Sequence, residues 1–287
     1  MKWRLIHPGT PCVDSEAKAF LLKREKFCVA ACARFIRINE NHGRVWCLEP
    51  NSGSSGELSA LLLYSNRGLF PVFGENITIP APDLLNRFPG RVKIHAVQGL
   101  RRDTDLLEAL MEKQGYFPAE KFDYHLMSLD SGTNLDPCVI AKNSPDGLVM
   151  RKPLPEDEDQ LFALQAAYEK EEVLPEKSGF DAAHCRLNLK RIISSEHVLV
   201  AELGGKVVGK INTSAASFRR YQIGGVYVLP GYRGHGIGLN MTVRFTEFLL
   251  ADGKGLTLFV KKRNAAAVKI YRKAGFNVLA DYRISYY

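Results

Sequence analysis

The segment GGVYVLPGYRGHGIGLNMTVRFTEFLL, residues 224–250, constrains the fold more than any other part of the chain. Its apolar, β-branched start predicts a strand, RGHGIG at 233–238 predicts a turn, and the apolar run that follows predicts a helix. The first amides of a helix have no partner within the helix, and glycines let an anion approach them and let the backbone take positive φ. We therefore expect an anion site at Gly234, Gly236 and Gly238.

Three known phosphate loops can be compared with this turn. A Walker loop needs Gly-Lys-Ser/Thr at its end, whereas Gly238 is followed by Leu239 and Asn240. A dinucleotide fingerprint needs G-x-G-x-x-G, and RGHGIG has a different spacing. The third pattern, R/Q-x-x-G-x-G/A, is satisfied by Arg233, Gly236 and Gly238.

The charge of the chain is concentrated around this turn. The formal net charge is +8, and residues 222–287 hold 10 Lys and Arg against 3 Asp and Glu, which is +7. Such a basic excess near a glycine-rich turn favours a polyanionic ligand. A nucleic acid and a small phosphate ester satisfy this observation equally well.

The element order after residue 147 predicts a mixed sheet covered by helices. Residues 128–147 are rich in Ser, Asp, Asn, Pro and Gly and separate two patterned regions. After them we expect the order β α β β β α β α β, with a two-glycine hairpin at Gly204 and Gly205 and a helix from Asn264 to Lys273. We expect a domain at 1–130, a linker at 131–146 and a second domain at 147–287.

The first half carries a weaker version of the same signals. A helix is expected over 16–37 and strands over 45–50, 59–65 and 68–74. LMEKQGYF at 110–117, followed by DYHLM, matches IYRKAGF at 270–276, followed by DYRIS. An internal repeat is therefore plausible, although two short matches can arise by chance. Nothing in the first half resembles RGHGIG, so a first copy would lack the ligand turn.

The strand, the turn, its helix and the later segment LTLFVKKRNAAAVKIYRKAGF together resemble the acyl-CoA binding core of the GNAT superfamily of N-acyltransferases. The resemblance covers about residues 147–287 in motif and in element order. It implies a GNAT-like α/β fold, and the duplicated plan is similar to tandem GNAT proteins in which one half has lost cofactor binding. It implies acetyl-CoA as co-substrate and an amine-bearing acceptor.

The resemblance also implies roles for matched positions. The turn and the start of its helix would hold the pyrophosphate of coenzyme A, the strand before it would pair with the pantetheine arm, and the Val228 amide would polarise the thioester carbonyl. Tyr271 would protonate the departing thiolate, and Asn264 would lie beside the cofactor. The implied cofactor-binding residues are Val226, Tyr227, Val228, Arg233, Gly234, His235, Gly236, Ile237, Gly238, Asn264 and Tyr271.

Local chemistry supports Asn264 and Tyr271 without deciding between roles. Asn264 is a favoured helix cap, and Tyr271, seven residues later, falls on nearly the same helix face. Asn264 could equally be a helix cap alone, and Tyr271 could equally be an ordinary half-buried aromatic residue. His235 lies at a free position of the pattern and is expected to be an exposed spacer.

The acceptor side is less clear. GNAT enzymes often carry a glutamate on the strand before the phosphate turn, but YQIGGVYVLP has none, which leaves the general base open. Glu171 and Glu172 follow the first helix of the second domain, where they could border the acceptor or form a solvated acidic cluster. Asn212 and Gln222 could offer hydrogen bonds to a substrate.

We therefore predict an N-acetyltransferase that moves an acetyl group from acetyl-CoA to a primary amine by direct attack, with no metal. A non-catalytic acyl-CoA binding or sensing protein is the alternative, and a nucleic-acid binder is a third, less favoured one. No stretch has the roughly 18–20 apolar residues of a membrane helix, and no secretion signal begins the chain. We therefore expect a soluble, cytoplasmic protein, and six cysteines without a CxxC pair predict buried, reduced thiols.

Overall fold

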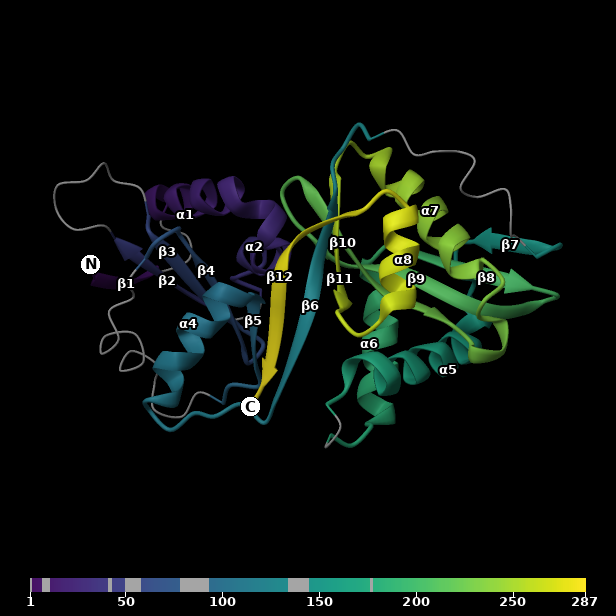
Figure 1. Cartoon of the computed structure of the whole chain (residues 1–287), viewed down its shortest axis with the longest axis horizontal. Coiled ribbons are helices and arrows are strands. Elements are labelled where there is room, and N and C mark those ends of the chain that lie inside the picture. The colour runs from purple at the N-terminus through teal and green to yellow at the C-terminus, as the bar shows by residue number, and fades with distance from the viewer. Residues whose placement is uncertain are drawn as a thin grey trace. The chain divides into compact units, whose positions relative to one another are not determined.

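The computed structural model describes residues 2–6, 11–40, 43–49, 58–77, 93–133, 145–175 and 178–287. The chain forms two compact units: unit 1 is Met1–Leu126 with Leu279–Tyr287, and unit 2 is Met127–Val278 (Figure 1). The last strand thus groups with unit 1, whereas the sequence had placed it in the second domain. Residues 134–144 of the expected linker lie outside the described part.

Unit 2 is a mixed sheet with helices on both faces, as the sequence predicts. Its sheet order is β11-β10-β9-β8-β7; the β10–β11 pair is parallel and the other pairs are antiparallel. The elements are β7 (Leu148–Arg151), α5 (Glu158–Tyr168), the π-helical turn η4 (Glu169–Val173), α6 (Ala182–Ser195), β8 (Val198–Leu203), β9 (Lys206–Ala216), β10 (Arg220–Val228), α7 (Ile237–Leu250), β11 (Gly255–Lys261) and α8 (Ala265–Lys273).

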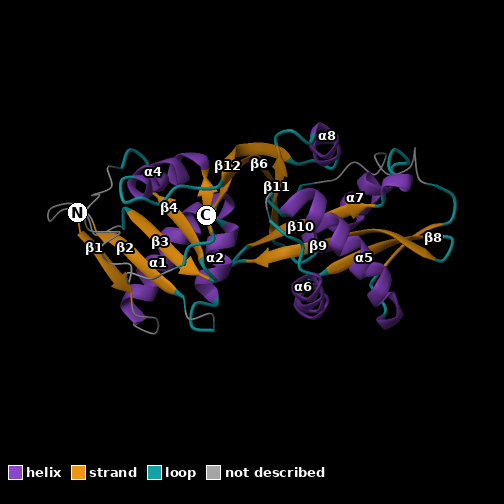
Figure 2. Cartoon of the chain, turned by 90° about the horizontal axis from the view of Figure 1, so that it is seen from below, coloured by secondary structure: helices purple, strands orange, loops and turns teal. Residues whose placement is uncertain are grey.

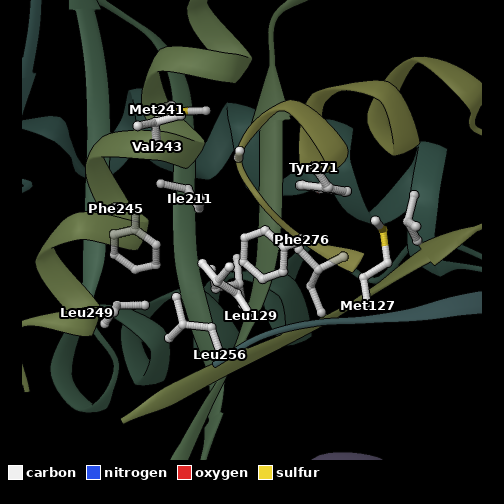
Figure 3. Packing of buried hydrophobic residues seen from close by; sticks show 14 of the residues in the cluster. Met127, Leu129, Ile211, Met241, Val243, Phe245, Leu249, Leu256, Tyr271 and Phe276 are labelled. Carbon is white, nitrogen blue, oxygen red and sulfur yellow. The ribbon is translucent and has the colours of Figure 1, made fainter. Parts of the chain in front are cut away.

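Two apolar clusters hold the helices of unit 2 to its sheet. Helices α7 and α8 cover one face, where Ile237, Met241, Phe245 and Tyr271 pack with residues of β9, β10 and β11 (Figure 3). Helices α5 and α6 cover the other face (Figure 2), in a smaller cluster that includes Tyr227 of β10. Successive residues of a strand point to opposite faces. Val226 and Val228 accordingly pack on the α7–α8 side, and Tyr227 packs on the α5–α6 side.

Unit 1 repeats this layout in its element order. Its sheet order is β1-β2-β3-β4-β5-β12-β6, and its β4–β5 pair is parallel, like β10–β11. The elements are β1 (Lys2–Ile6), α1 (Pro11–Arg24), the short helix η1 (Glu25–Phe27), α2 (Val29–Ile36), β2 (Arg44–Glu49), β3 (Ala60–Ser65), β4 (Gly68–Phe73), β5 (Ala96–Leu100), α4 (Arg101–Glu112), β6 (Glu120–Leu129) and β12 (Asn277–Tyr286).

The two short sequence matches end their helices in the same way. In unit 1 the Tyr116 amide donates to the Met111 carbonyl at 3.1 Å, and in unit 2 the Phe276 amide donates to the Tyr271 carbonyl at 3.0 Å. The glycine between them has φ of 84° in the first case and 91° in the second, a conformation that favours glycine. In the order of elements along the chain, unit 2 has α7 between its parallel strands; the corresponding stretch of sequence in unit 1 is 74–95, of which 78–92 lie outside the described residues.

The expected element order after residue 147 was incomplete, because it omitted α6. This helix has an apolar stripe at Cys185, Leu189 and Ile192, and Asp181 caps it by accepting the His184 amide at 3.0 Å. The spacing of four and three residues is that of one helix face. Polar residues between the stripe positions hid this signal.

The hairpin and four of the six cysteines agree with the predictions from the sequence. Gly204 and Gly205 both have positive φ, as a two-residue hairpin loop requires. Cys28, Cys32, Cys47 and Cys185 are buried free thiols, while Cys138 lies outside the described residues. In the described part of the chain, no helix has the length and apolar character needed to cross a bilayer.

Candidate functional site

Strands β10 and β11 stop pairing with each other and separate at the centre of unit 2. Their parallel register runs from Arg220 opposite Gly255 to Ile223 opposite Leu258. Residues 224–228 of β10 and 259–261 of β11 lie beyond the last paired residues. We call this place the β10–β11 split. The glycine turn and α7 follow from β10, and α8 follows from β11, so both matched motifs meet at the split (Figure 1).

The glycine turn has the backbone that its sequence predicts. Gly234 and Gly236 have φ of 84° and 75°, and Gly236 is the residue before the first turn of α7. A Cβ atom added at Gly234 would meet no atom within 4 Å. Glycine is therefore favoured there by the positive φ and not by a lack of space. The turn therefore presents backbone amides at a helix start with open space beside them, which is an arrangement suited to phosphate.

The Val228 amide faces away from the neighbouring strand β9. The amide of the next residue, Leu229, donates to the Val208 carbonyl on β9 at 2.9 Å. Adjacent amides of a strand point to opposite sides, so the Val228 amide points toward the side on which β11 has left the sheet. It is thus placed to donate to a ligand in the split.

Arg233 is held by a carboxylate from the turn after α5. Its two terminal nitrogens each donate to an oxygen of Glu171 at 2.9 Å, and its Nε donates to the Val228 carbonyl at 2.9 Å. The Tyr227 hydroxyl donates to the same carboxylate at 2.9 Å. The hydrogen bonds from Arg233 chiefly hold the pKa of Glu171 below its ordinary value, against the raising effect of partial burial. Glu171 is therefore an anion at neutral pH.

Glu172 reaches the opposite side of the split. One of its oxygens accepts from the Asn264 side chain at 3.1 Å, and the other lies 3.5 Å from the Lys261 ammonium. Asn264 also caps α8, because its side-chain oxygen accepts the Ala267 amide at 3.0 Å. The cap confirms one of the two readings of Asn264. Consecutive glutamates thus contact both edges of the split, in a region that the sequence had linked to the acceptor.

Tyr271 lies in the apolar cluster beneath α8. Its side chain is buried, and its ring packs edge-on against the ring of Phe276, with the two ring centroids 6.3 Å apart (Figure 3). Burial raises the pKa of the Tyr271 phenol above its ordinary value, and Tyr168 and Glu172 raise it further. The phenol therefore stays protonated at neutral pH, which is the state a proton donor needs.

Two of the residues suggested for substrate contacts are buried in β9 and β10. Asn212 accepts from the Lys210 ammonium at 2.9 Å and donates to the Thr213 carbonyl at 2.8 Å. Gln222 donates to the Ser214 hydroxyl at 2.9 Å. Asn212 lies opposite Gly224 where the β9–β10 register shifts, and Gln222 lies within the paired part of β10. Only Asn212 is thus next to the split.

The remaining sequence predictions are placed as follows. His235 is exposed, Ile237 is buried beneath the start of α7, and Gly238 lies against Ile270, whose Cδ1 would be 3.4 Å from an added Cβ. Among the described residues, no group of three or more His, Cys, Asp and Glu side chains could hold a metal ion.

Sequence reasoning missed the buried residue Lys210 beside this site. A lysine inside the strand KVVGKINTSA was the available signal, because its neighbours Val207, Val208 and Ile211 are apolar. Tyr168 was missed as well, and its ring lies 5.2 Å from the Lys210 ammonium and 6.4 Å from the ring of Tyr227. Its place at the end of an apolar helix gave no distinguishing signal.

Most of unit 2 is similar in sequence to one known protein family. Residues 160–276 match the sequence profile described as the Acetyltransferase (GNAT) family. This segment is a GNAT domain. It contains the glycine turn, both edges of the split, Glu171 and Glu172, so every contact described above lies within the matched residues. No curated protein gives a significant match to the chain in sequence.

Several solved structures resemble this chain in fold over nearly its whole length. A Drosophila protein has a TM-score of 0.65 at 12% identity, with 99% of this chain and 98% of that chain covered. A GNAT-family acetyltransferase from Colwellia psychrerythraea has a TM-score of 0.59 at 12% identity, with 100% of each chain covered. A tandem GNAT protein from the clavulanic acid biosynthesis pathway has a TM-score of 0.59 at 11% identity, with 99% of this chain and 97% of that chain covered. At these identities the likeness shows the fold alone, and the mixed α/β fold expected from the sequence is confirmed.

Proposed function

We propose that the GNAT domain transfers an acetyl group from acetyl-CoA to a primary amine by direct attack in a ternary complex. The observation that carries this proposal is the β10–β11 split, from which β10 leads into the glycine turn and β11 leads into α8, the helix of Tyr271. Family membership of residues 160–276 supports the acetyl donor. The basic excess of residues 222–287 supports a ligand with several phosphates.

The residues of the site fit coenzyme A as follows. Positive φ at Gly234 and Gly236 leaves the amides at the start of α7 available to the pyrophosphate. The amides of Val226 and Val228 pair with the pantetheine arm along the unpaired part of β10, and Arg233 adds positive charge at the turn. His235, Ile237 and Gly238 contribute their backbone to the same cradle, and Asn264 adjoins the cofactor at the start of α8.

The proposed reaction needs little beyond positioning. The neutral amine attacks the thioester carbonyl, and the Val228 amide stabilises the negative oxygen that forms. The thiolate then leaves and takes a proton from Tyr271, whose raised pKa keeps that proton available. The attacking nitrogen releases its extra proton to water, and Tyr271 regains a proton before the next turnover. Holding amine and thioester together supplies much of the rate gain. Strand β10 carries no carboxylate, so no residue is assigned as the general base.

For unit 1 we propose a degenerate copy of the GNAT fold, with 131–146 as the connection to the catalytic domain at 147–287. The repeated element order, the parallel β4–β5 pair and the similar helix ends at Gly115 and Gly275 support this proposal. The sequence between β4 and β5 contains no R-x-x-G-x-G pattern. We expect one acetyl-CoA site per chain.

The experiment that tests the proposed function is an amine screen with acetyl-CoA, in which release of free thiol and the mass of the product are both measured. Acetylated amine formed in equal amount to free coenzyme A is the expected result. Saturable acetyl-CoA binding without turnover on any amine would favour the alternative, a non-catalytic acyl-CoA binding protein. Absence of acetyl-CoA binding would overturn both.

A further inference from the structure

Lys210 of β9 buries its whole side chain on the α5–α6 side of unit 2. It is 1% exposed, and its ammonium donates to the Asn212 side-chain oxygen at 2.9 Å and to the Gly225 carbonyl at 3.1 Å. Both acceptors are neutral. Burial of a lysine without a carboxylate partner costs stability, so a residue of this kind marks a candidate functional position.

The charged and titratable groups that face Lys210 come from three helical elements. Tyr168 ends α5, and its ring lies 5.2 Å from the Lys210 ammonium. Glu169 lies at the start of η4 and Cys185 lies in α6, and both favour the charged lysine electrostatically. The Glu169 carboxylate accepts from Gln165 at 2.8 Å and from Asn188 at 3.1 Å. Burial outweighs both groups and lowers the pKa of Lys210 to about 7.

Strand β10 is shaped around this lysine. The β9–β10 register shifts between Gly224 and Tyr227, and Gly225 within the shift has φ of 59°. A Cβ atom added at Gly225 would lie 2.0 Å from the Asn212 side-chain oxygen and 2.8 Å from the Lys210 nitrogen. Only glycine fits, so the bulge, Asn212 and Lys210 form one arrangement.

We propose that Lys210 is a positioning residue for the acyl donor, which acts by holding and polarising the peptide that joins Gly225 to Val226. The carbonyl of this peptide accepts from Lys210, and its amide belongs to Val226, the first residue of β10 assigned to the pantetheine arm. A hydrogen bond received at a carbonyl strengthens the donor at the other end of the peptide. This inference rests on the proposed function of the split.

The charge on Lys210 sets the strength of this effect. An ammonium is a stronger donor than a neutral amine, so the Val226 amide binds pantetheine best when Lys210 is charged. By linkage, acetyl-CoA raises the pKa of Lys210, and its affinity falls as the pH rises through neutrality. If Lys210 were instead a base for the attacking amine, it would act in its neutral form, and turnover would rise as the pH rises through neutrality.

The first test compares two ligands on Lys210→Met, which keeps the chain length and removes the donor. Acetyl-CoA affinity is expected to fall roughly tenfold, the effect of one charge-assisted hydrogen bond. ADP shares the adenosine and pyrophosphate of coenzyme A and lacks the pantetheine arm, so its affinity should stay within about twofold. Lys206→Met, at an exposed position of the same strand, is the control. Unchanged acetyl-CoA affinity, or equal loss for both ligands, would overturn the proposal.

The pH dependence of acetyl-CoA affinity adds a second readout. The unaltered protein should bind progressively less tightly from about pH 6 to 8, and Lys210→Met should lose this component, since ionisation of the ligand phosphates affects both proteins alike. Identical pH profiles would contradict the role of the lysine charge.

A measurement on the unaltered protein keeps the proposal testable if Lys210→Met fails to fold. Gly–Val occurs once in the sequence, at Gly225–Val226. Labelling glycine carbonyls with ¹³C and valine amides with ¹⁵N therefore gives one NMR signal for this peptide. The signal should titrate with a midpoint near pH 7, and a signal that does not move would overturn the proposal. Failure of acetyl-CoA to bind would instead overturn the proposed function and leave this readout intact.

Discussion

Glu171 places both of its carboxylate oxygens on the guanidinium of Arg233, at 2.9 Å each. The two residues are 62 positions apart in sequence, and Arg233 is the first residue of the glycine-turn pattern. The contact puts a negative charge beside the amides proposed to receive the pyrophosphate. An incoming phosphate therefore meets an arginine that already has an anionic partner.

Replacing Glu171 with glutamine should tighten acetyl-CoA binding by about two- to fivefold at low salt. The change removes a like charge near the phosphates, and both side chains are 43% exposed, so solvent screening keeps the effect modest. Titrations at low and high salt measure it, and the gain should shrink as salt rises. Glu247→Gln, which breaks the exposed pair with Arg244 on α7, is the control. Weaker binding of Glu171→Gln would show that this carboxylate supports the ligand site.

Replacing Tyr271 with phenylalanine should lower turnover at least about tenfold and leave acetyl-CoA affinity within about twofold. The variant keeps the ring that packs against Phe276 and removes the proposed proton donor. Steady-state rates with an amine from the screen, together with a binding titration, test this. Tyr282→Phe, a buried tyrosine of β12 in unit 1, should behave like the unaltered protein. Equal turnover of Tyr271→Phe would remove Tyr271 from the mechanism.

Replacing Asn264 with alanine should have two separable effects. Loss of the cap of α8 should cost about 1 kcal/mol in the free energy of unfolding, measured with denaturant. Asp181→Ala, which removes the cap of α6, should cost a similar amount. Only Asn264→Ala should also weaken acetyl-CoA binding, because Asn264 holds Glu172 at the split. Equal ligand affinity in both variants would reduce Asn264 to a cap.

Lys210 should make stability depend on pH. Its pKa is about 7 in the folded protein and near 10.5 in the unfolded chain. Between these values the unfolded state binds more protons, so the free energy of unfolding should increase as the pH rises from about 7 to 10.5. Over this pH range the free energy of unfolding should increase by about 5 kcal/mol or less. Denaturant curves of Lys210→Met should lack this increment, and parallel curves for both proteins would contradict the buried charge.

Local patterns predicted much of unit 2. The two-glycine hairpin, the turn before α7 and the Asn264 cap each depend on residues within a few positions of one another. The sequence analysis missed α6, β1 and β5, which are short or interrupted by polar residues. In unit 1, Gly115 and Gly275 revealed related helix ends because a positive φ there requires glycine.

The contacts across the split could not be predicted in the same way. Glu172 and Asn264 are 92 residues apart, and only the tertiary fold brings them together. No pattern within η4 indicates that neighbouring glutamates contact different strands. Lys210 was detectable as a lysine in an apolar strand, but its partner at Gly225 depends on a bulge that the sequence does not specify.

Whether the glycine turn binds coenzyme A is best tested by calorimetric titration with acetyl-CoA of the unaltered protein, Gly236→Glu and Gly253→Glu. Gly236 and Gly253 have nearly equal φ, 75° and 73°, so both variants carry the same backbone strain and the same added charge. Only Gly236 lies in the turn before α7. We expect one site per chain, lost in Gly236→Glu and kept in Gly253→Glu. Undiminished binding in Gly236→Glu, or no binding to the unaltered protein, would contradict it.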